Sequence, residues 1–323
     1  MLVEWLRPYE ALLVPILSRR QDIASVEDIL ERHLDLVDWT RVSSNANAIS
    51  FLERHLDRVD WKSFSYNSRA VHHLEANLDR VDWTRLSRNP GAMLLLEAHL
   101  DKVNWLAVSS NHGAIPLLQK HVDRVHWPSV MQNTNGAELL EQHLDRVVWA
   151  DLALVRDKAF IARHHQRLTQ WYLCFKHPEL QELVEGNLDK LSQREWSILS
   201  KHAAYMHVLR EFPMFICWGW LSENTAAVEL LEQNLDKVDW SALSKNAGAA
   251  ELLRKHLDKV DWKQASLNEG AVELLEQNLE NVDWECVSYN PGAWSLLQQH
   301  VDKICWRWFT ENPIFLTSTV FLA

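Results

Sequence analysis

Apolar and polar residues repeat along this chain with a period of 22, and a tryptophan marks each period. A fixed period of this size is typical of a solenoid, in which each unit buries its apolar face against its neighbours. The tryptophans recur at Trp39, Trp61, Trp83, Trp105, Trp127, Trp149 and Trp171 and, after a shift of three residues, at Trp196, Trp218, Trp240, Trp262, Trp284 and Trp306.

The other positions can be numbered as columns, with each tryptophan at column 0. Asn occupies column 6 in most units, as in Asn246 and Asn268, and Asn is a favoured helix N-cap. Pro follows it in several units, which suits the first helical position. Apolar residues at columns 9, 12, 13, 17 and 20 then form a helical stripe. This pattern predicts a first helix of about three turns that ends near column 18.

A second start signal precedes each tryptophan, because column 21 is usually Asp, as in Asp239 and Asp261. Such an Asp can cap a short helix that carries Trp at column 0 and an apolar residue at column 3 on one face. The sequence therefore predicts an all-α protein, a right-handed-type α-solenoid of helix–turn–short-helix repeats of 22 residues.

The tryptophans themselves are predicted to be structural residues of the core, since burying an indole at every turn of the array is strongly stabilising. A ladder of rings that stacks on a ligand is the alternative interpretation. The structural set comprises Trp39, Trp61, Trp83, Trp105, Trp127, Trp240, Trp262 and Trp284.

The repeats differ in regularity along the chain. We predict an N-terminal apolar cap (1–27), regular repeats (28–149), degenerate repeats (150–220), regular repeats (221–312) and a C-terminal apolar tail (313–323). Ser192–Arg194 is the predicted three-residue insertion. The aromatic run at 205–220 predicts either a kink or a contact patch. Phe212, Phe215 and Trp220 are its candidate interaction residues, and caps that also form a homodimer are a further hypothesis.

Column 16 holds His or Asn, as in His256 and Asn278. A metal site needs several ligands that converge on one point, whereas this column supplies one per repeat, and Asn is a poor ligand for transition metals. His and Asn share a hydrogen-bond donor. We therefore predict a ladder of hydrogen bonds to backbone carbonyls near the helix end, and no metal site.

The net charge of −11 argues against partners with a phosphate backbone and against an anionic membrane surface. Columns 5, 7, 10, 11 and 15 vary most and are expected to point outward. Column 11 carries Glu229, Glu251 and Glu273 in consecutive repeats, a stripe that predicts either a site for a basic segment of a protein partner or a solubilising surface.

We find no catalytic or targeting motif in the sequence. It contains no glycine-rich phosphate loop, no GxSxG and no HExxH, which predicts a non-enzymatic protein without a cofactor. Its four cysteines form no CxxC, which favours a reducing compartment. No apolar stretch has the length of a membrane span, and the N-terminus lacks the pattern of a signal peptide. We expect an intracellular protein.

The string LLEQNLDKVDWSALSKN (230–246) resembles a tandem repeat of predicted proteins in giant DNA viruses of the marseillevirus and mimivirus kind. The resemblance covers residues 28–149 and 221–312 well and 150–220 weakly. It implies a viral origin, in the host cytoplasm or the virion, and an interaction-type family without catalytic residues. The expected function is a scaffold for a protein partner, with a host protein as one target. The alternatives are a self-associating virion component and a nucleic-acid-binding helical repeat.

Overall fold

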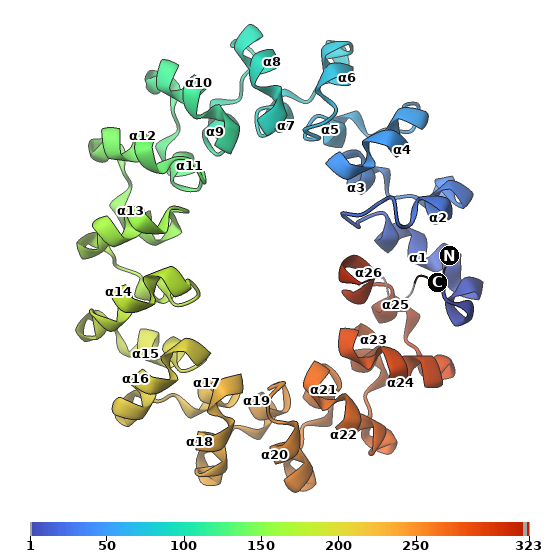
Figure 1. The fold of residues 1–323 in the computed structure, drawn as a ribbon, viewed down its shortest axis with the longest axis vertical. Coiled ribbons are helices and arrows are strands. Elements are labelled where there is room, and N and C mark those ends of the chain that lie inside the picture. The colour runs from blue at the N-terminus through green and yellow to red at the C-terminus, as the bar shows by residue number, and fades with distance from the viewer. Residues whose placement is uncertain (1, 319–321, 323) are drawn as a thin grey trace. The chain divides into compact units, whose positions relative to one another are not determined.

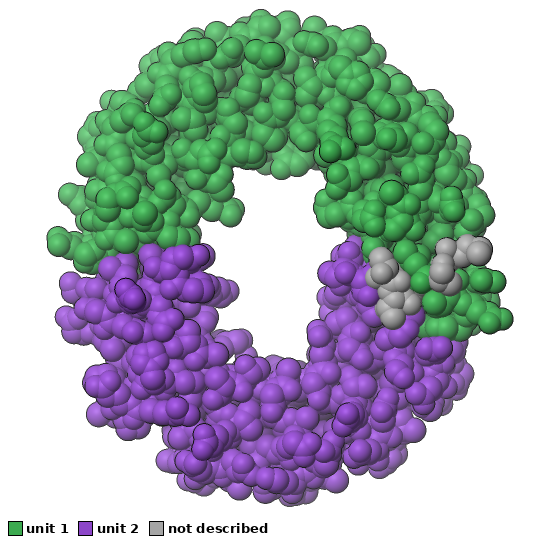
Figure 2. All heavy atoms as spheres, viewed as in Figure 1, with its two compact units in different colours: residues 1–170, 322–323 green, residues 171–321 purple. Residues whose placement is uncertain are grey.

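The computed structural model describes residues 2–318 and 322, and its regular elements are α-helices and short 3-10 helices (Figure 1). They divide into two compact units, residues 1–170 with 322–323, and residues 171–321 (Figure 2). In the first unit an isolated antiparallel bridge pairs Leu2 with Leu322. The prediction of an all-helical repeat fold is confirmed for the described residues, while the handedness of the solenoid stays a prediction.

Over its described residues, the first unit contains thirteen α-helices and ten 3-10 helices (η). The α-helices are α1 (Glu10–Leu17), α2 (Glu27–Arg32), α3 (Trp39–Ser43), α4 (Ile49–Arg54), α5 (Trp61–Phe64), α6 (Val71–Glu75), α7 (Trp83–Leu86), α8 (Met93–Ala98), α9 (Trp105–Ser109), α10 (Ile115–Lys120), α11 (Trp127–Met131), α12 (Ala137–Gln142) and α13 (Lys158–Arg163). The 3-10 helices are η1 (Glu4–Tyr9), η2 (Leu34–Leu36), η3 (Ala46–Ala48), η4 (Leu78–Arg80), η5 (Pro90–Ala92), η6 (His112–Ala114), η7 (Val122–Arg124), η8 (Leu144–Arg146), η9 (Trp149–Leu154) and η10 (His165–Arg167).

In the second unit the same alternation continues over its described residues. The α-helices are α14 (Gln181–Glu185), α15 (Gln193–Leu199), α16 (Met206–Glu211), α17 (Trp218–Ser222), α18 (Val228–Glu232), α19 (Trp240–Ser244), α20 (Ala250–Lys255), α21 (Trp262–Ser266), α22 (Val272–Glu276), α23 (Trp284–Tyr289), α24 (Trp294–Gln299), α25 (Trp306–Phe309) and α26 (Ile314–Thr317). The 3-10 helices are η11 (Trp171–Cys174), η12 (Pro178–Leu180), η13 (Leu188–Lys190), η14 (Ala203–Tyr205), η15 (Pro213–Phe215), η16 (Thr225–Ala227), η17 (Leu235–Lys237), η18 (Leu257–Lys259), η19 (Glu269–Ala271), η20 (Leu279–Asn281), η21 (Pro291–Ala293) and η22 (Val301–Lys303).

The short helices that begin at the tryptophans of successive repeats stack side by side. In the second unit α17, α19, α21, α23 and α25 contact one another in sequence. They line the concave side of that unit, and α18, α20, α22 and α24 line its convex side (Figure 1). The short helices are therefore the surface that this unit presents to anything held in its concavity.

Both predicted caps are present. Asn268 Oδ1 accepts a hydrogen bond from the Gly270 N–H at 2.9 Å, and Asp261 Oδ1 accepts one from the Gln264 N–H at 3.2 Å. The same bonds recur through the regular repeats of both units. Each cap satisfies an N–H group that a helix start otherwise leaves unpaired.

The column 6 asparagines also join successive repeats, which the sequence analysis missed. Asn268 Nδ2 donates to the carbonyl oxygens of Ser244 at 2.9 Å and Asn246 at 3.0 Å, both in the preceding repeat. Ser244 Oγ donates to the Trp240 carbonyl at 2.7 Å and accepts from the Asp261 N–H at 3.0 Å. The side chains at these columns are buried, so a polar spine runs beside the apolar core.

The first helix is shorter than predicted. The α-helix of the repeat ends at column 15, because column 16 leaves helical geometry (His256 has φ −134° and ψ 54°) and a separate 3-10 turn follows at Leu257–Lys259. Column 17 therefore leaves the apolar stripe, and Leu257 is 43% exposed. The prediction of one continuous helix of three turns with column 17 in the core is wrong.

The periodic tryptophans are half-buried, and their structural role stays a prediction. The fully buried apolar position of the short helix is column 3, represented by Leu243 with 0% exposure. Half-burial applies to Trp39, Trp61, Trp83, Trp105, Trp127, Trp240, Trp262 and Trp284. Two tryptophans of the degenerate repeats, Trp171 and Trp196, are buried, with 3% and 5% exposure.

Column 16 divides into two behaviours. Asn278 Nδ2 donates to the Leu274 carbonyl at 2.7 Å, and Asn77, Asn187 and Asn234 do the same four residues back, as predicted. Most of the histidines instead lie against the tryptophan of their own repeat, with ring centroids 5.0 Å apart for Trp240 and His256. His165 is an exception, since its Nδ1 lies 2.8 Å from the Ala162 carbonyl oxygen. The predicted bonds to backbone carbonyls are thus present for these asparagines and for His165.

The two ends carry apolar residues that are buried. Leu13 and Leu17 of α1 are fully buried, and Phe315 of α26 packs edge-on against Phe309 with centroids 5.1 Å apart. The part of the predicted tail at 319–321 and 323 lies outside the described residues. Among the described helices, none combines the length and the apolar character that a membrane span requires.

Candidate interaction surface

The degenerate repeats of the second unit differ from the regular ones at the start of α15. Ser192 Oγ accepts from the Glu195 N–H at 3.3 Å, and Glu195 Oε2 accepts from the Ser192 N–H at 2.9 Å, which is a capping box. The predicted insertion thus forms the start of a helix of seven residues, longer than its short-helix counterparts α17 and α19 with five each.

Glu195 also ties α15 to the preceding repeat. Its side chain is buried, and Oε1 accepts hydrogen bonds from the N–H groups of Trp171 at 2.7 Å and Tyr172 at 3.3 Å. The column 6 asparagine is absent here, since His177 and His202 occupy that column. A buried carboxylate therefore makes an inter-repeat link in a region where the asparagine spine is interrupted.

One face of α15 lines a groove on the short-helix side of this unit. Ser197 and Ile198 follow Arg194 by three and four positions, so these side chains share a face of α15, and Lys201 follows just after the helix ends. The groove has a volume of about 690 Å³ and is bounded by Tyr172, Leu173, Lys176, Arg194, Ser197, Ile198, Lys201, His202 and Trp220. We call this the basic groove.

Its charge contrasts with that of the chain. Lys176, Arg194 and Lys201 give the basic groove three cations, in a protein of net charge −11. Burial, together with Lys176 and Lys201, lowers the pKa of His202 below its ordinary value. That imidazole is therefore neutral at pH 7 and acts as a hydrogen-bonding group rather than a fourth cation.

Aromatic rings accompany these cations. Trp220 is 42% exposed, with Lys201 Nζ at 5.1 Å from its ring centroid, and the Arg194 guanidinium lies 5.9 Å from the Tyr172 ring. Lys201 also pairs with Glu223 at 2.5 Å. The groove can therefore hold an anionic group beside an apolar or aromatic one.

A smaller cavity of about 180 Å³ shares Lys176 and His202 with the basic groove and is lined in part by Tyr205. The Tyr205 hydroxyl is buried with no hydrogen-bond partner among the described residues. Burial chiefly raises its pKa to about 12, with Glu185 and Cys174 adding to the shift. This hydroxyl is a protonated donor that its surroundings leave unused.

Phe212 and Phe215 lie elsewhere, on the side of α15 that carries Trp196. Phe215 stacks on Trp196 with ring centroids 4.5 Å apart, and Met214 beside it is 74% exposed. These side chains line a second groove of about 610 Å³, which we call the aromatic groove. The predicted aromatic patch thus divides, since Trp220 belongs to the basic groove.

The predicted acidic stripe lies on the convex helices α18, α20 and α22. The side chains of Glu229, Glu251 and Glu273 are exposed, but Arg210 reaches Glu229 at 3.8 Å and Arg254 pairs with both Glu251 and Glu273. Two arginines therefore offset part of its charge. The structure does not bring these glutamates together with Phe212, Phe215 or Trp220.

The cysteine that lines a small apolar cavity on the same short-helix side is not an activated nucleophile. Burial first, and then the carboxyl of Asp283, raise the pKa of Cys286 to about 11, so its thiol stays protonated at neutral pH.

No protein-family model, curated protein or solved structure matches this chain. The sequence analysis missed the basic groove, although one signal pointed to it. Lys176 and Lys201 both occupy column 5, a variable column, in two successive degenerate repeats of an acidic chain.

Proposed function

We propose that this protein is a non-enzymatic repeat scaffold that binds an acidic segment of another protein in the basic groove. The observation that carries the proposal is the combination of three cations, two aromatic rings and the unused Tyr205 hydroxyl around two cavities that share Lys176 and His202. Charge complementarity accelerates encounter and fixes register, and the aromatic rings supply apolar contact area.

The preferred ligand is an extended peptide with several Asp or Glu residues and one aromatic side chain. Its carboxylates would pair with Lys176, Arg194 and Lys201, and its aromatic side chain would lie on Trp220. Lys and Arg pair with carboxylates through charge-assisted hydrogen bonds, which exceed neutral ones in strength.

Single-stranded RNA would use the same groove chemistry, because cations track phosphates and aromatic rings stack on bases. The net charge of −11 opposes a long polyanion far more than a short acidic peptide. We therefore favour the peptide and keep RNA as an outcome of the test.

The test is fluorescence anisotropy of a labelled acidic peptide, with a labelled oligouridine of equal charge as the comparison. Replacing Lys176, Arg194 and Lys201 by Glu should weaken peptide binding about tenfold or more. The matched control replaces Lys102, Lys259 and Lys303 by Glu, which changes the net charge equally at side chains that are each 55% exposed. Equal losses in both triple variants would refute the groove as the site, and tighter binding of the oligouridine would refute the choice of ligand.

Self-association is the second candidate, and the aromatic groove favours it. Met214 and Phe215 are 74% and 41% exposed, and apolar exposure of this kind is typical of contact surfaces. Replacing both by Ser would then lower the mass measured by light scattering at high concentration. A viral origin and a host target stay predictions of the resemblance, and affinity purification from infected cells compared with purified virions would test them.

A further inference from the structure

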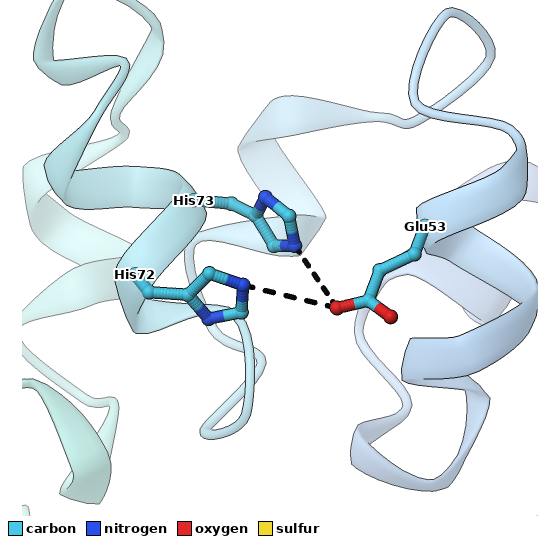
Figure 3. A group of neighbouring side chains, drawn as sticks. All are labelled: Glu53, His72 and His73. Atoms are coloured by element: carbon cyan, nitrogen blue, oxygen red, sulfur yellow. Dashed lines mark hydrogen bonds and ion pairs between the residues drawn. The ribbon is translucent and has the colours of Figure 1, made fainter.

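A cluster of two histidines and one glutamate lies on the first unit. Glu53 belongs to α4, and His72 and His73 belong to α6 of the next repeat (Figure 3). Glu53 Oε1 lies 3.3 Å from His73 Nε2 and 3.8 Å from His72 Nε2. Both imidazoles thus point at one carboxylate oxygen.

This arrangement differs from the ion pair that some other repeats make at the same columns. There a glutamate one repeat back pairs with a base at the end of the following helix, as in Lys120 with Glu97 and Lys255 with Glu232. In the repeat of α6, Ala76 occupies the position of that base. Glu53 instead faces the two histidines, which are spaced side by side on α6.

We propose that Glu53, His72 and His73 form a binding site for a divalent transition-metal ion, with Zn²⁺ as the best match. Two imidazoles and one carboxylate are a known ligand set for zinc sites that keep a fourth position for water. In a tetrahedral site with bonds of about 2.0–2.1 Å, ligand atoms lie about 3.3–3.4 Å apart. The three ligand atoms all lie within 4.8 Å of one another, so small side-chain rotations bring them to that spacing.

The cluster is open to an incoming ion. The side chains of His72 and Glu53 are 62% and 45% exposed, and that of His73 is 20% exposed. Bound metal would connect α4 to α6, as the ion pairs of Lys120 with Glu97 and Lys255 with Glu232 connect their helices. Imidazole ligands favour Zn²⁺, Cu²⁺ or Ni²⁺ over Mg²⁺ and Ca²⁺, which prefer oxygen ligands.

Isothermal titration of Zn²⁺ alone into the full chain, after chelator treatment, tests the site. The double variant His72→Ala/His73→Ala should lose one zinc equivalent relative to the parent, and Glu53→Gln should weaken the same site by at least about tenfold. The matched control is His164→Ala. His164 also faces a glutamate of the preceding repeat, Glu141, at 3.2 Å, but as a single histidine and not as one of two. This variant should leave the zinc stoichiometry and affinity unchanged.

A further variant tests the site without removing either histidine. Ala76→Lys places a lysine at the position that Lys120 and Lys255 have in their repeats. This lysine should pair with Glu53 and weaken zinc binding while both histidines remain. Co²⁺ absorption gives an independent readout, because thiolate ligation by the four cysteines has a charge-transfer band that a His₂Glu site lacks. Unchanged stoichiometry in the double variant, or an equal loss with His164→Ala, would overturn the proposal.

Discussion

The second unit contains two kinds of repeat that solve the same packing problem differently. In residues 221–312 each repeat is joined to the one before by a buried asparagine, such as Asn246 or Asn268. In residues 171–220 that column holds His177 and His202, and the buried Glu195 makes an inter-repeat link instead. Both grooves proposed for binding occur in the second region.

The difference shows where this scaffold has room to change. A regular repeat must keep Asn and Ser in fixed columns, because their side chains satisfy buried backbone groups of the neighbouring repeat. A repeat that uses another link is released from that pattern. In this region the surface carries Lys176, Arg194 and Lys201 beside Trp220. We infer that function in this protein is concentrated where the spine is interrupted.

The tryptophans give the sharpest contrast between the two regions. Trp196 is buried and stacked on Phe215, whereas Trp262 is half-buried. We expect Trp196→Ala to lower the free energy of unfolding by about 3–5 kcal/mol, the range for buried aromatic truncations, and Trp262→Ala by about half of that. Urea denaturation followed by circular dichroism measures both. Equal losses would show that the two tryptophans play the same role.

The asparagine spine provides the next test. Asn268→Ala leaves the Ser244 carbonyl and the Gly270 N–H without their partner, while the Asn246 carbonyl keeps its hydrogen bond from the Ala249 N–H. Each unsatisfied buried group costs about 1 kcal/mol or more, so we expect a loss of about 2–4 kcal/mol. Asn281→Ala, at an exposed position of η20, is the control and should change stability by less than about 0.5 kcal/mol. Hydrogen exchange should show the loss around α19 to α22, and a uniform loss along the chain would contradict a local spine.

The inter-repeat link made by Glu195 can be tested by a substitution that keeps the size of the side chain. Glu195→Gln keeps the volume but replaces one acceptor oxygen by a donor, opposite N–H groups that themselves donate. We expect a loss of about 1–2 kcal/mol, confined in hydrogen exchange to η11 and α15. Glu232→Gln in the regular region, where the carboxylate pairs with Lys255 at the surface, should have almost no effect. A similar result for both variants would remove the distinction between the two regions.

The sequence predicted the repeat, the all-helical class, both caps and the buried column 3, because these depend on residues near one another in the chain. Two errors came from one break in geometry. Column 16 leaves the helix, so Leu257 turns outward, although a continuous helix would have buried it. The spine was missed for another reason. The bonds of Asn268 to Ser244 and Asn246 exist only once neighbouring repeats are stacked.

The candidate site was predicted less well than the fold. Trp220 lies in the basic groove, but Phe212 and Phe215 face the aromatic groove, and the acidic stripe is partly neutralised by arginines. Arg194 and Trp220 are distant in sequence and occupy unrelated columns, so periodicity alone does not connect them. The insertion contributes Arg194, which lies about two turns before Lys201 and lines the same groove as Trp220.

The smallest expected effect concerns the unused hydroxyl beside the basic groove. Tyr205→Phe removes a buried hydroxyl that has no partner, so we expect it to raise the free energy of unfolding by about 1 kcal/mol at pH 7. Because the folded pKa is raised from 10 to about 12, the unfolded chain loses this proton first as the pH rises. The stability of the parent should therefore fall between about pH 10 and pH 12 through this group, and it is fully retained below that window.

The phenylalanine variant lacks that titration, so its advantage over the parent should grow across the same interval. Parallel urea denaturation of both proteins at pH 8, 10 and 11 measures the difference, and Tyr66→Phe at an exposed tyrosine is the control, with a constant difference near zero. If Tyr205→Phe is instead destabilising at pH 7, the hydroxyl has a partner in the free protein. The basic groove then lacks the donor that we assign to ligand binding, and the cations and Trp220 alone must account for any affinity that is measured.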